Sequence, residues 1–339
     1  MNANVTTREL HLAVPFAISR ATHTTKTVVL VELHEDRGVA RGEAVPDAFF
    51  GETAAGVASD IEAALELLPD DPADIALLDM RLAIQFPRGG AACCAIDILA
   101  HDRAAQAAGV PLRDFLGLAP ADPPATSFTI GIAEPQVMAE RAAKAAASGF
   151  TILKVKLGGG DDVAAVTAIR ERFGGTIRVD PNAAWSADEA PARIAALVPF
   201  GIEFVEQPIA PDDIDGLRRV RERSELPIVA DEAVVHPGDV ARVAGACDGI
   251  NVKLQKCGGI AAARRMIAEA HDRGLRVMLG CRAAETSVAI GAAAHLAAAV
   301  DWVDLDGNLL VSDDPYRAVS VAGGRFVFSG RPGIGAVPA

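Results

Sequence analysis

Short apolar runs and longer amphipathic segments alternate along residues 126–306. The apolar runs have the length of buried strands, and the segments between them space their apolar residues as helices do, for example at Val163, Val166 and Ile169. The expected strands are 126–131, 151–156, 177–180, 203–206, 227–231, 249–253, 275–280 and 302–306. Eight strands in strict alternation with helices predict a closed barrel. An open doubly wound sheet is the alternative, but no glycine-rich dinucleotide motif follows the first strand.

The residues on either side of this barrel follow other patterns. Residues 5–44 predict strands joined by a hairpin, helical spacing begins at Val57, and an alanine-rich helix is expected over 91–107. A strand at 323–330 is expected to return to this first region. We therefore predict an α/β protein, a modified TIM barrel (β/α)7β with an α+β capping domain. The expected parts are residues 1–120 for the capping domain, 121–315 for the barrel with the catalytic site, and 316–339 for a C-terminal segment that returns to the cap.

Composition narrows the class of partner. The chain has 339 residues, half of them hydrophobic, and a formal net charge of −13 without basic runs interleaved with aromatic residues. We therefore expect a small-molecule substrate and no nucleic acid or membrane partner. The start, MNANVTTREL, lacks a secretory signal pattern, and five cysteines without CxxC pairing fit a reducing compartment, so a cytoplasmic location is expected. Seven scattered histidines give little support to a histidine-built zinc site.

Charged residues occupy the ends of six of the predicted strands. They are Lys154, Lys156, Asp180, Glu206, Asp231, Lys253, Asp304 and Asp306. Active sites of barrels form at the carboxyl ends of the strands. A single charged residue there could cap a helix or face solvent, but six strands that share the feature favour one common site.

Three of these residues predict a metal site. Asp180, Glu206 and Asp231 end consecutive strands, so their carboxylates would converge and repel one another without a cation. Hard oxygen ligands of this kind select Mg²⁺, and we expect one ion per subunit. Lys156 precedes this group on one side, and Lys253 follows it on the other.

The segment TILKVKL, residues 151–157, places Lys154 and Lys156 on one face of a strand. In isolation the pattern fits an exposed edge strand that lysines guard against aggregation, but a closed barrel has no edge. A lysine beside a divalent cation and a second lysine has its charged form disfavoured, so we expect its pKa to fall toward neutrality. Lys154 would supply the second charge. On the sixth strand we prefer Lys253 to Lys256 as the base, because apolar residues at 250, 252 and 254 occupy the opposite face.

These groups suit removal of a proton from the carbon next to a carboxylate. Mg²⁺ and the ammonium groups would stabilise the enediolate dianion, and one lysine would remove the proton. A lysine on the other face could return a proton from the opposite side and invert the stereocentre. A different class of enzyme, a Schiff-base aldolase with Lys154 or Lys156 as nucleophile, would need no metal. A metal-binding barrel without catalysis would have little use for lysines on both sides.

Nearly the full chain resembles the enolase superfamily, in its muconate-lactonizing subgroup. TILKVKLG resembles the KxK strand, VDPNAAW, VEQPI and VADEAV resemble the three metal-ligand segments, and NVKLQKCGGI resembles the sixth-strand lysine segment. Residues 42–53 resemble the loop of the capping domain, and 95–117 the helix that leads into the barrel. The resemblance implies that Asn182 and Glu232, within these segments, support the metal ligands.

Within the subgroup, VDLDGNLL at 303–310 resembles the Asp-x-Asp of dipeptide epimerases. The resemblance implies that Asp304 and Asp306 hold the α-ammonium of a dipeptide. It also implies that Arg20, in the loop PFAISRATHTTK, faces the glutamate carboxylate of L-Ala-D/L-Glu. A pair of aspartates that caps a loop and a solvent-facing surface arginine are the competing interpretations. The implied function is Mg²⁺-dependent epimerisation of a dipeptide by two-lysine 1,1-proton transfer.

Two departures from the family pattern bear on the substrate. The strand-seven segment MLGCRAAETS is one residue longer than usual and carries Arg282, which could face an acidic side chain or solvent. The segment PNAAW lacks a common glutamine. We expect an intact catalytic core with a different side-chain pocket, in a homo-oligomer. An N-acylamino-acid racemase, a cycloisomerase or a dehydratase of the same superfamily is the alternative. A mandelate-racemase type of site is disfavoured because strand seven offers no histidine base.

Overall fold

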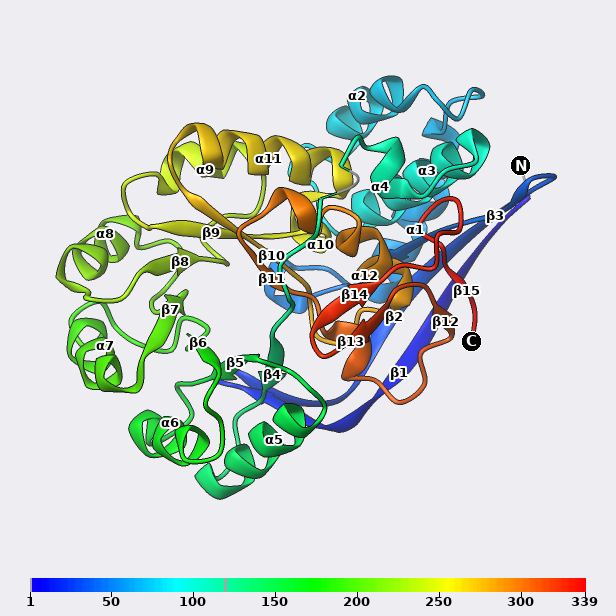
Figure 1. Cartoon of the computed structure of the whole chain (residues 1–339). Coiled ribbons are helices and arrows are strands. Elements are labelled where there is room, and N and C mark those ends of the chain that lie inside the picture. The colour runs from blue at the N-terminus through cyan, green and yellow to red at the C-terminus, as the bar shows by residue number, and fades with distance from the viewer. Residues whose placement is uncertain (1, 119–120) are drawn as a thin grey trace.

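The computed structural model describes residues 2–118 and 121–339, and its centre is a parallel eight-stranded barrel (Figure 1). The strands are β4 (Phe128–Ile130), β5 (Ile152–Lys156), β6 (Thr176–Asp180), β7 (Ile202–Glu206), β8 (Ile228–Ala230), β9 (Gly249–Lys253), β10 (Arg276–Gly280) and β11 (Trp302–Asp304). The ring closes just before β4, where Thr126 bridges Val303 and Ser127 N donates to Val303 O at 3.1 Å. The predicted barrel is confirmed with all eight strands, and the open doubly wound alternative is wrong.

The helices between these strands lie on the outside of the ring (Figure 1). They are α5 (Pro135–Ala147), α6 (Asp162–Arg170), α7 (Ala190–Leu197), α8 (Ile214–Arg223), α9 (Pro237–Val243), α10 (Leu254–Cys257), α11 (Ile260–Asp272) and α12 (Ser287–Ala294). Because barrel strands are buried on both faces, they consist of nearly continuous apolar runs. Phe204, Val229, Met278 and Trp302 form one small core cluster, separate from the main core. No helix in the described ranges is long and apolar enough to cross a membrane.

The residues before the barrel form an antiparallel sheet covered by helices. The strands are β1 (Ala3–Ile18), β2 (Ala21–Glu35) and β3 (Gly38–Ala44), and the helices are α1 (Ala54–Ala64), α2 (Ile75–Gln85), α3 (Ala91–Ala108) and α4 (Leu112–Phe115). Val31 of the sheet packs in one core with Ile61 of α1 and Ile96 of α3. The sequence pattern did not reveal α2, which buries only Leu78 and Leu82.

The long β1–β2 hairpin carries the cap over the barrel. In Figure 1 it runs from the cap to the vicinity of β4 and β5, and there Ile132 N donates to Ala17 O at 2.9 Å. The hairpin turn at residues 18–21 is therefore held at the barrel by backbone bonding. This contact brings the loop singled out in the sequence to the carboxyl ends of the strands.

The chain after β11 forms β12 (Tyr316–Arg317), β13 (Ser320–Ala322), β14 (Arg325–Val327) and β15 (Val337–Pro338). The strand expected at 323–330 is present as β14, which pairs with β13 because Gly323 and Gly324, both at positive φ, reverse the chain. Phe328, directly after β14, reaches the first region, since its ring centre lies 4.6 Å from the guanidinium carbon of Arg113 in α4. Thr126 N, next to the barrel, donates to Gly324 O at 2.8 Å. A further contact with the first region follows, where Ile334 N donates to Asp102 Oδ1 at 2.8 Å. The domain boundaries expected at 120 and at 315 stay predictions. The first of them lies beside residues 119–120, which are outside the described ranges.

Candidate active site

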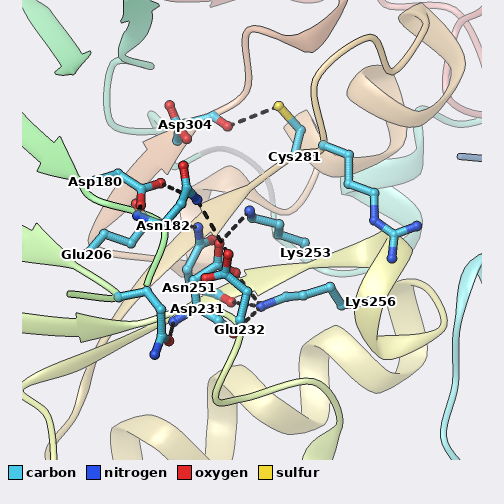
Figure 2. Close-up of polar contacts among 12 residues, drawn as sticks. Asp180, Asn182, Glu206, Asp231, Glu232, Asn251, Lys253, Lys256, Cys281 and Asp304 are labelled. Atoms are coloured by element: carbon cyan, nitrogen blue, oxygen red, sulfur yellow. Dashed lines mark hydrogen bonds and ion pairs between the residues drawn. The ribbon is translucent and has the colours of Figure 1, made fainter. Parts of the chain in front are cut away.

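Three carboxylates meet at the carboxyl ends of adjacent barrel strands (Figure 2). Asp180 ends β6, Glu206 ends β7 and Asp231 directly follows β8. All three are buried, and one oxygen of each lies within 4.8 Å of the others. The structure thus brings together the three residues that the strand pattern predicted to converge.

This donor set fits a hard divalent cation. The three carboxylates offer only oxygen ligands, without sulfur or imidazole. Asn182, in the left-handed region at φ 49°, donates through Nδ2 to Asp180 Oδ2 at 3.3 Å and to Glu232 Oε1 at 3.4 Å. Two buried oxygens, Asn182 Oδ1 and Glu232 Oε2, have no hydrogen-bond partner among the described residues. The predicted supporting residues therefore lie beside the triad and offer further oxygen atoms.

Two lysines approach the triad from opposite sides. Lys156, on β5, places Nζ 2.6 Å from Asp180 Oδ2, and Lys253, on β9, places Nζ 2.6 Å from Asp231 Oδ2. In the order of the sheet, β5 and β9 flank the strands that carry or precede the carboxylates. Both side chains line a cavity of about 110 Å³ at this end of the barrel.

Lys154 is more deeply buried, among three carboxylates. Its Nζ lies 2.7 Å from Glu206 Oε2, 2.8 Å from Asp304 Oδ2 and 3.2 Å from Asp180 Oδ2. Burial lowers the pKa of Lys154, but Asp304, Glu206 and Asp180 outweigh burial and hold that pKa well above its usual value. Lys154 and Lys156 share Asp180 Oδ2 as a partner, so the second positive charge predicted near Lys156 is present, balanced by carboxylates.

The close ion pairs around the triad set the direction of several pKa shifts. Burial lowers the pKa of Lys253, but the adjacent Asp231 carboxylate raises it above its usual value, and the carboxylate dominates. Burial would raise the pKa of Asp231, yet Lys253 and Lys256 hold it well below its usual range. Burial and Asp180 raise the pKa of Glu206 to about 8. The contact between ammonium and carboxylate, which the sequence pattern did not include, sets the direction of the pKa shift for Lys253, and the lowered lysine pKa expected beside a cation stays a prediction.

Three buried polar residues that the sequence analysis did not assign fix the triad in place. Lys256 Nζ donates to Asp231 Oδ1 at 2.6 Å and to three backbone oxygens, so its donors are fully engaged, and the choice of Lys253 over Lys256 as the base stays a prediction. Asn251 Nδ2 donates to Glu206 Oε1 at 2.8 Å, and Gln207 Oε1 accepts from Asp231 N at 2.9 Å. Asn251 lies two positions before Lys253, so strand alternation could have found it. No local signal marks Gln207.

Asp304 and Asp306 connect β11 to the first barrel strand. Asp304 Oδ1 accepts from Ser127 Oγ at 2.5 Å, and Asp306 Oδ2 accepts from Thr129 N at 2.6 Å. Burial and the charge of Asp304 raise the pKa of Asp306 to about 7. Both aspartates line the cavity, where Cys281 Sγ donates to the backbone oxygen of Asp304 at 3.3 Å. They face the same cavity as Lys156 and Lys253.

Arg20 lies above the triad, with about a third of its side chain (35%) exposed. Its Nη2 donates to Glu232 Oε1 at 2.8 Å, and its Nη1 donates to the backbone oxygen of Asn182 at 3.0 Å. The guanidinium carbon lies 4.6 Å from the centre of the Phe49 ring. Since a guanidinium has five N–H donors, these two bonds leave donors available on the cavity side.

Arg282 resolves one alternative left open by the sequence. Its side chain is buried, and Nη1 donates to Glu52 Oε2 at 2.9 Å and to the backbone oxygen of Val45. Glu52 belongs to the loop that follows β3, so Arg282 faces an acidic side chain of the cap. The same loop contains Phe50, whose ring centre lies 5.1 Å from the guanidinium carbon. Arg282 therefore connects the seventh-strand loop of the barrel to the cap.

The structure is a (β/α)7β barrel under an N-terminal cap, with a carboxylate triad between two lysines. This arrangement defines a class of barrels that can hold a hard cation beside ionisable side chains. The family described as "Enolase C-terminal domain-like" matches residues 137–339. The family described as "Mandelate racemase / muconate lactonizing enzyme, N-terminal domain" matches residues 1–117. The chain therefore belongs to the enolase superfamily.

Two relatives are similar over most of their length. An L-Ala-D/L-Glu epimerase of Bacteroides thetaiotaomicron is 38% identical and covers 96% of this chain and 85% of its own. A hydrophobic dipeptide epimerase of Enterococcus faecalis is 37% identical, with 92% of this chain and 91% of its own covered.

Solved structures show the same similarity. The dipeptide epimerase from Enterococcus faecalis V583, complexed with Mg and the dipeptide L-Leu-L-Tyr, has a TM-score of 0.93 and 34% identity, with 98% of both chains covered. The N-succinyl Arg/Lys racemase from Bacillus cereus ATCC 14579 has a TM-score of 0.93 and 27% identity, covering 99% of this chain and 95% of its own.

Proposed function

We propose that this protein is an isomerase, a Mg²⁺-dependent dipeptide epimerase that transfers a proton away from and back to one carbon. The observation that carries the proposal is the position of Lys156 and Lys253, 2.6 Å from carboxylates at opposite sides of one triad. Relatives named as dipeptide epimerases, and a similar structure complexed with Mg and a dipeptide, support it. L-Ala-D/L-Glu or a related dipeptide is the first substrate to test.

Each group of the site has a role in this reaction. Asp180, Glu206 and Asp231 would hold Mg²⁺, which when bound supplies positive charge that stabilises the enediolate form of the substrate. Lys156 and Lys253 act on opposite faces of the substrate carbon, so one removes the proton and the other returns one with inversion.

The same geometry orients the substrate. Asp304 and Asp306 would accept hydrogen bonds from the α-ammonium of the dipeptide, because both line the cavity beside the triad. Arg20 would bind an acidic side chain with the N–H donors that Glu232 and Asn182 do not use. The ammonium of Lys154, held among Glu206, Asp180 and Asp304, lets these carboxylates stay close together.

The test is to incubate the protein with dipeptide mixtures in D₂O. Mass spectrometry then measures the exchange of the α-proton for deuterium, and chiral analysis measures epimerisation. We expect exchange that excess EDTA stops and added Mg²⁺ restores. Lys156→Met and Lys253→Met should each stop epimerisation, and the double variant should also stop exchange. Lys144→Met, on the exposed side of α5, is the matched control and should behave as the parent. Continued exchange in the double variant would show that other groups move the proton.

Racemisation of an N-acylated amino acid is a second candidate function, because the N-succinyl Arg/Lys racemase has the same fold at a TM-score of 0.93. Such a substrate has no free α-ammonium. Asp304→Asn and Asp306→Asn should therefore reduce activity strongly on a dipeptide and weakly on an N-acyl substrate. A homo-oligomeric assembly and a cytoplasmic location stay predictions from the sequence.

A further inference from the structure

The cap side of the cavity carries cationic groups at two separate places. Arg20 lies in the hairpin turn, and Lys26 lies six residues later on β2, roughly 20 Å away at about 3.3 Å per residue of an extended strand. Both line the cavity. Arg20 contacts Asn182 and Glu232, which follow β6 and β8, and so lies above the triad. Lys26 must therefore face a different part of the substrate.

Lys26 lies on the side of the cavity formed by the last barrel strands. Lys26 pairs with Leu10 of β1, and two residues further along β1 Leu12 bridges Val311, which lies five residues after Asp306. Lys26, Asp304, Asp306 and Leu310 all line the same cavity. Lys26 is consequently near the end of the cavity that contains the two aspartates proposed for the α-ammonium.

The ammonium of Lys26 has no partner of its own within the described part of the chain. Every other lysine and arginine that lines the cavity there has a carboxylate within 4.0 Å; the contacts are those of Arg20, Lys154, Lys156, Lys253, Lys256 and Arg282. Asp47 contributes charge near Lys26, but it accepts from Phe49 N at 3.0 Å and lies 3.9 Å from Arg282 Nε. A half-buried ammonium without a carboxylate partner attracts the carboxylate of a ligand more strongly than it would in bulk water.

We propose that Lys26 binds a side-chain carboxylate of the dipeptide residue that carries the α-ammonium, so that the protein prefers dipeptides with Asp or Glu in the first position. The inference rests on the proposed function, which places that ammonium at Asp304 and Asp306. With Arg20 available for a second acidic side chain, the substrate class becomes a dipeptide of two acidic residues. An alanine in the first position would leave Lys26 without a partner.

The experiment compares substrates that differ by one charge at nearly constant shape. The value of kcat/KM is measured for L-Glu-L-Glu and L-Gln-L-Glu, which differ only in the first residue, and for L-Glu-L-Gln, which changes the second. We expect the Glu/Gln ratio at the first position to be on the order of tenfold or more, the size of one partly desolvated charge pair. Lys26→Met and Lys26→Gln should bring this ratio close to one, whereas Lys26→Arg should keep it. Lys144→Met is the charge-matched control and should leave the ratio as in the parent.

The possible outcomes separate this inference from the proposed function. A first-position ratio near one in the parent, or one that survives in both neutral Lys26 variants, overturns the inference while epimerisation itself stands. A loss of the second-position ratio in those variants, with the first unchanged, also overturns it. Absence of exchange with every dipeptide overturns the proposed function and, with it, the inference. Two neutral variants are included so that poor folding of one does not decide the result.

Discussion

The barrel side and the cap side of the cavity place their charges by different means. On the barrel side, Lys156 lies in register with Asp180 across β5 and β6, so their contact follows directly from strand pairing. On the cap side, Arg20 and Lys26 come from a hairpin, and Glu52 from a loop, that meet the barrel only through tertiary packing. The difference suggests that the reaction chemistry is built into a rigid sheet, while substrate choice depends on a cap whose position has to be secured.

Two contacts of charged side chains are among those that secure the cap. Glu43, at the end of β3, accepts from Thr286 N at 2.7 Å and from Ala289 N at 3.0 Å, which joins the capping sheet to the first turn of α12. Arg282 pairs with Glu52 of the capping loop at 2.9 Å. Both contacts are buried or nearly so. Substitutions on the two sides should therefore change different measured quantities.

The largest effect is expected on the barrel side, from Glu206→Gln. Removal of one of three carboxylate ligands should lower kcat/KM by on the order of 10³-fold and weaken Mg²⁺ binding measured by calorimetry. Glu222→Gln, on the exposed surface of α8, is the control and should change neither quantity. Full activity with undiminished Mg²⁺ binding in Glu206→Gln would mean that the triad is not the cation site.

At the junction of the two sides, Glu43 should make stability depend on pH. Burial raises the pKa of Glu43 from its usual 4.5 to about 7. The folded state then binds the proton more tightly than the unfolded state, so this contribution is fully present below pH 4.5 and is lost as the pH rises through 7. The free energy of unfolding should fall by up to about 3 kcal/mol over that range. Urea unfolding at pH 5 and pH 8 should show a smaller difference for Glu43→Gln than for the parent, and equal differences would contradict the assignment.

A smaller effect is expected from Arg282→Met, which removes the partner of Glu52. A nearly buried carboxylate left without its cation should reduce the free energy of unfolding by about 1 to 3 kcal/mol. We expect KM to rise more than kcat falls, because the cap is loosened while the triad is untouched. Arg273→Met removes an exposed surface pair with Glu269 and should cost below about 1 kcal/mol. Equal losses in the two variants would argue against a securing role for Arg282.

The smallest effect should come from Phe49→Ala on the cap. The ring lies 4.6 Å from the guanidinium carbon of Arg20 and is about half exposed, so the contact is worth about 0.5 to 1 kcal/mol. KM for a substrate with an acidic second residue should rise by about two- to fivefold, measured in the exchange assay. If KM for the matching neutral substrate rises equally, Phe49 does not act through Arg20.

Much of the barrel could be predicted from the sequence, because each strand is a short local pattern and a closed parallel barrel has one geometry. Asp180, Glu206 and Asp231 follow from that geometry once the strands are placed. The helix α2 and the reversal at Gly323 were missed, since the first buries few residues and the second depends on pairing with β13. The buried supports Gln207 and Lys256 act on residues of other segments, which periodicity does not report.

By itself, the sequence determined which residues end the barrel strands, and therefore the triad and the lysine on each side of it. It did so because side-chain alternation and strand order convert positions in the chain directly into directions in space. The tertiary structure alone decided the contact of Lys253 with Asp231, the pairing of Arg282 with Glu52 and the isolation of Lys26. Those properties depend on distances between charged groups from segments far apart in the chain. Burial lowers the local dielectric constant, so the interaction energy changes strongly with each of these distances.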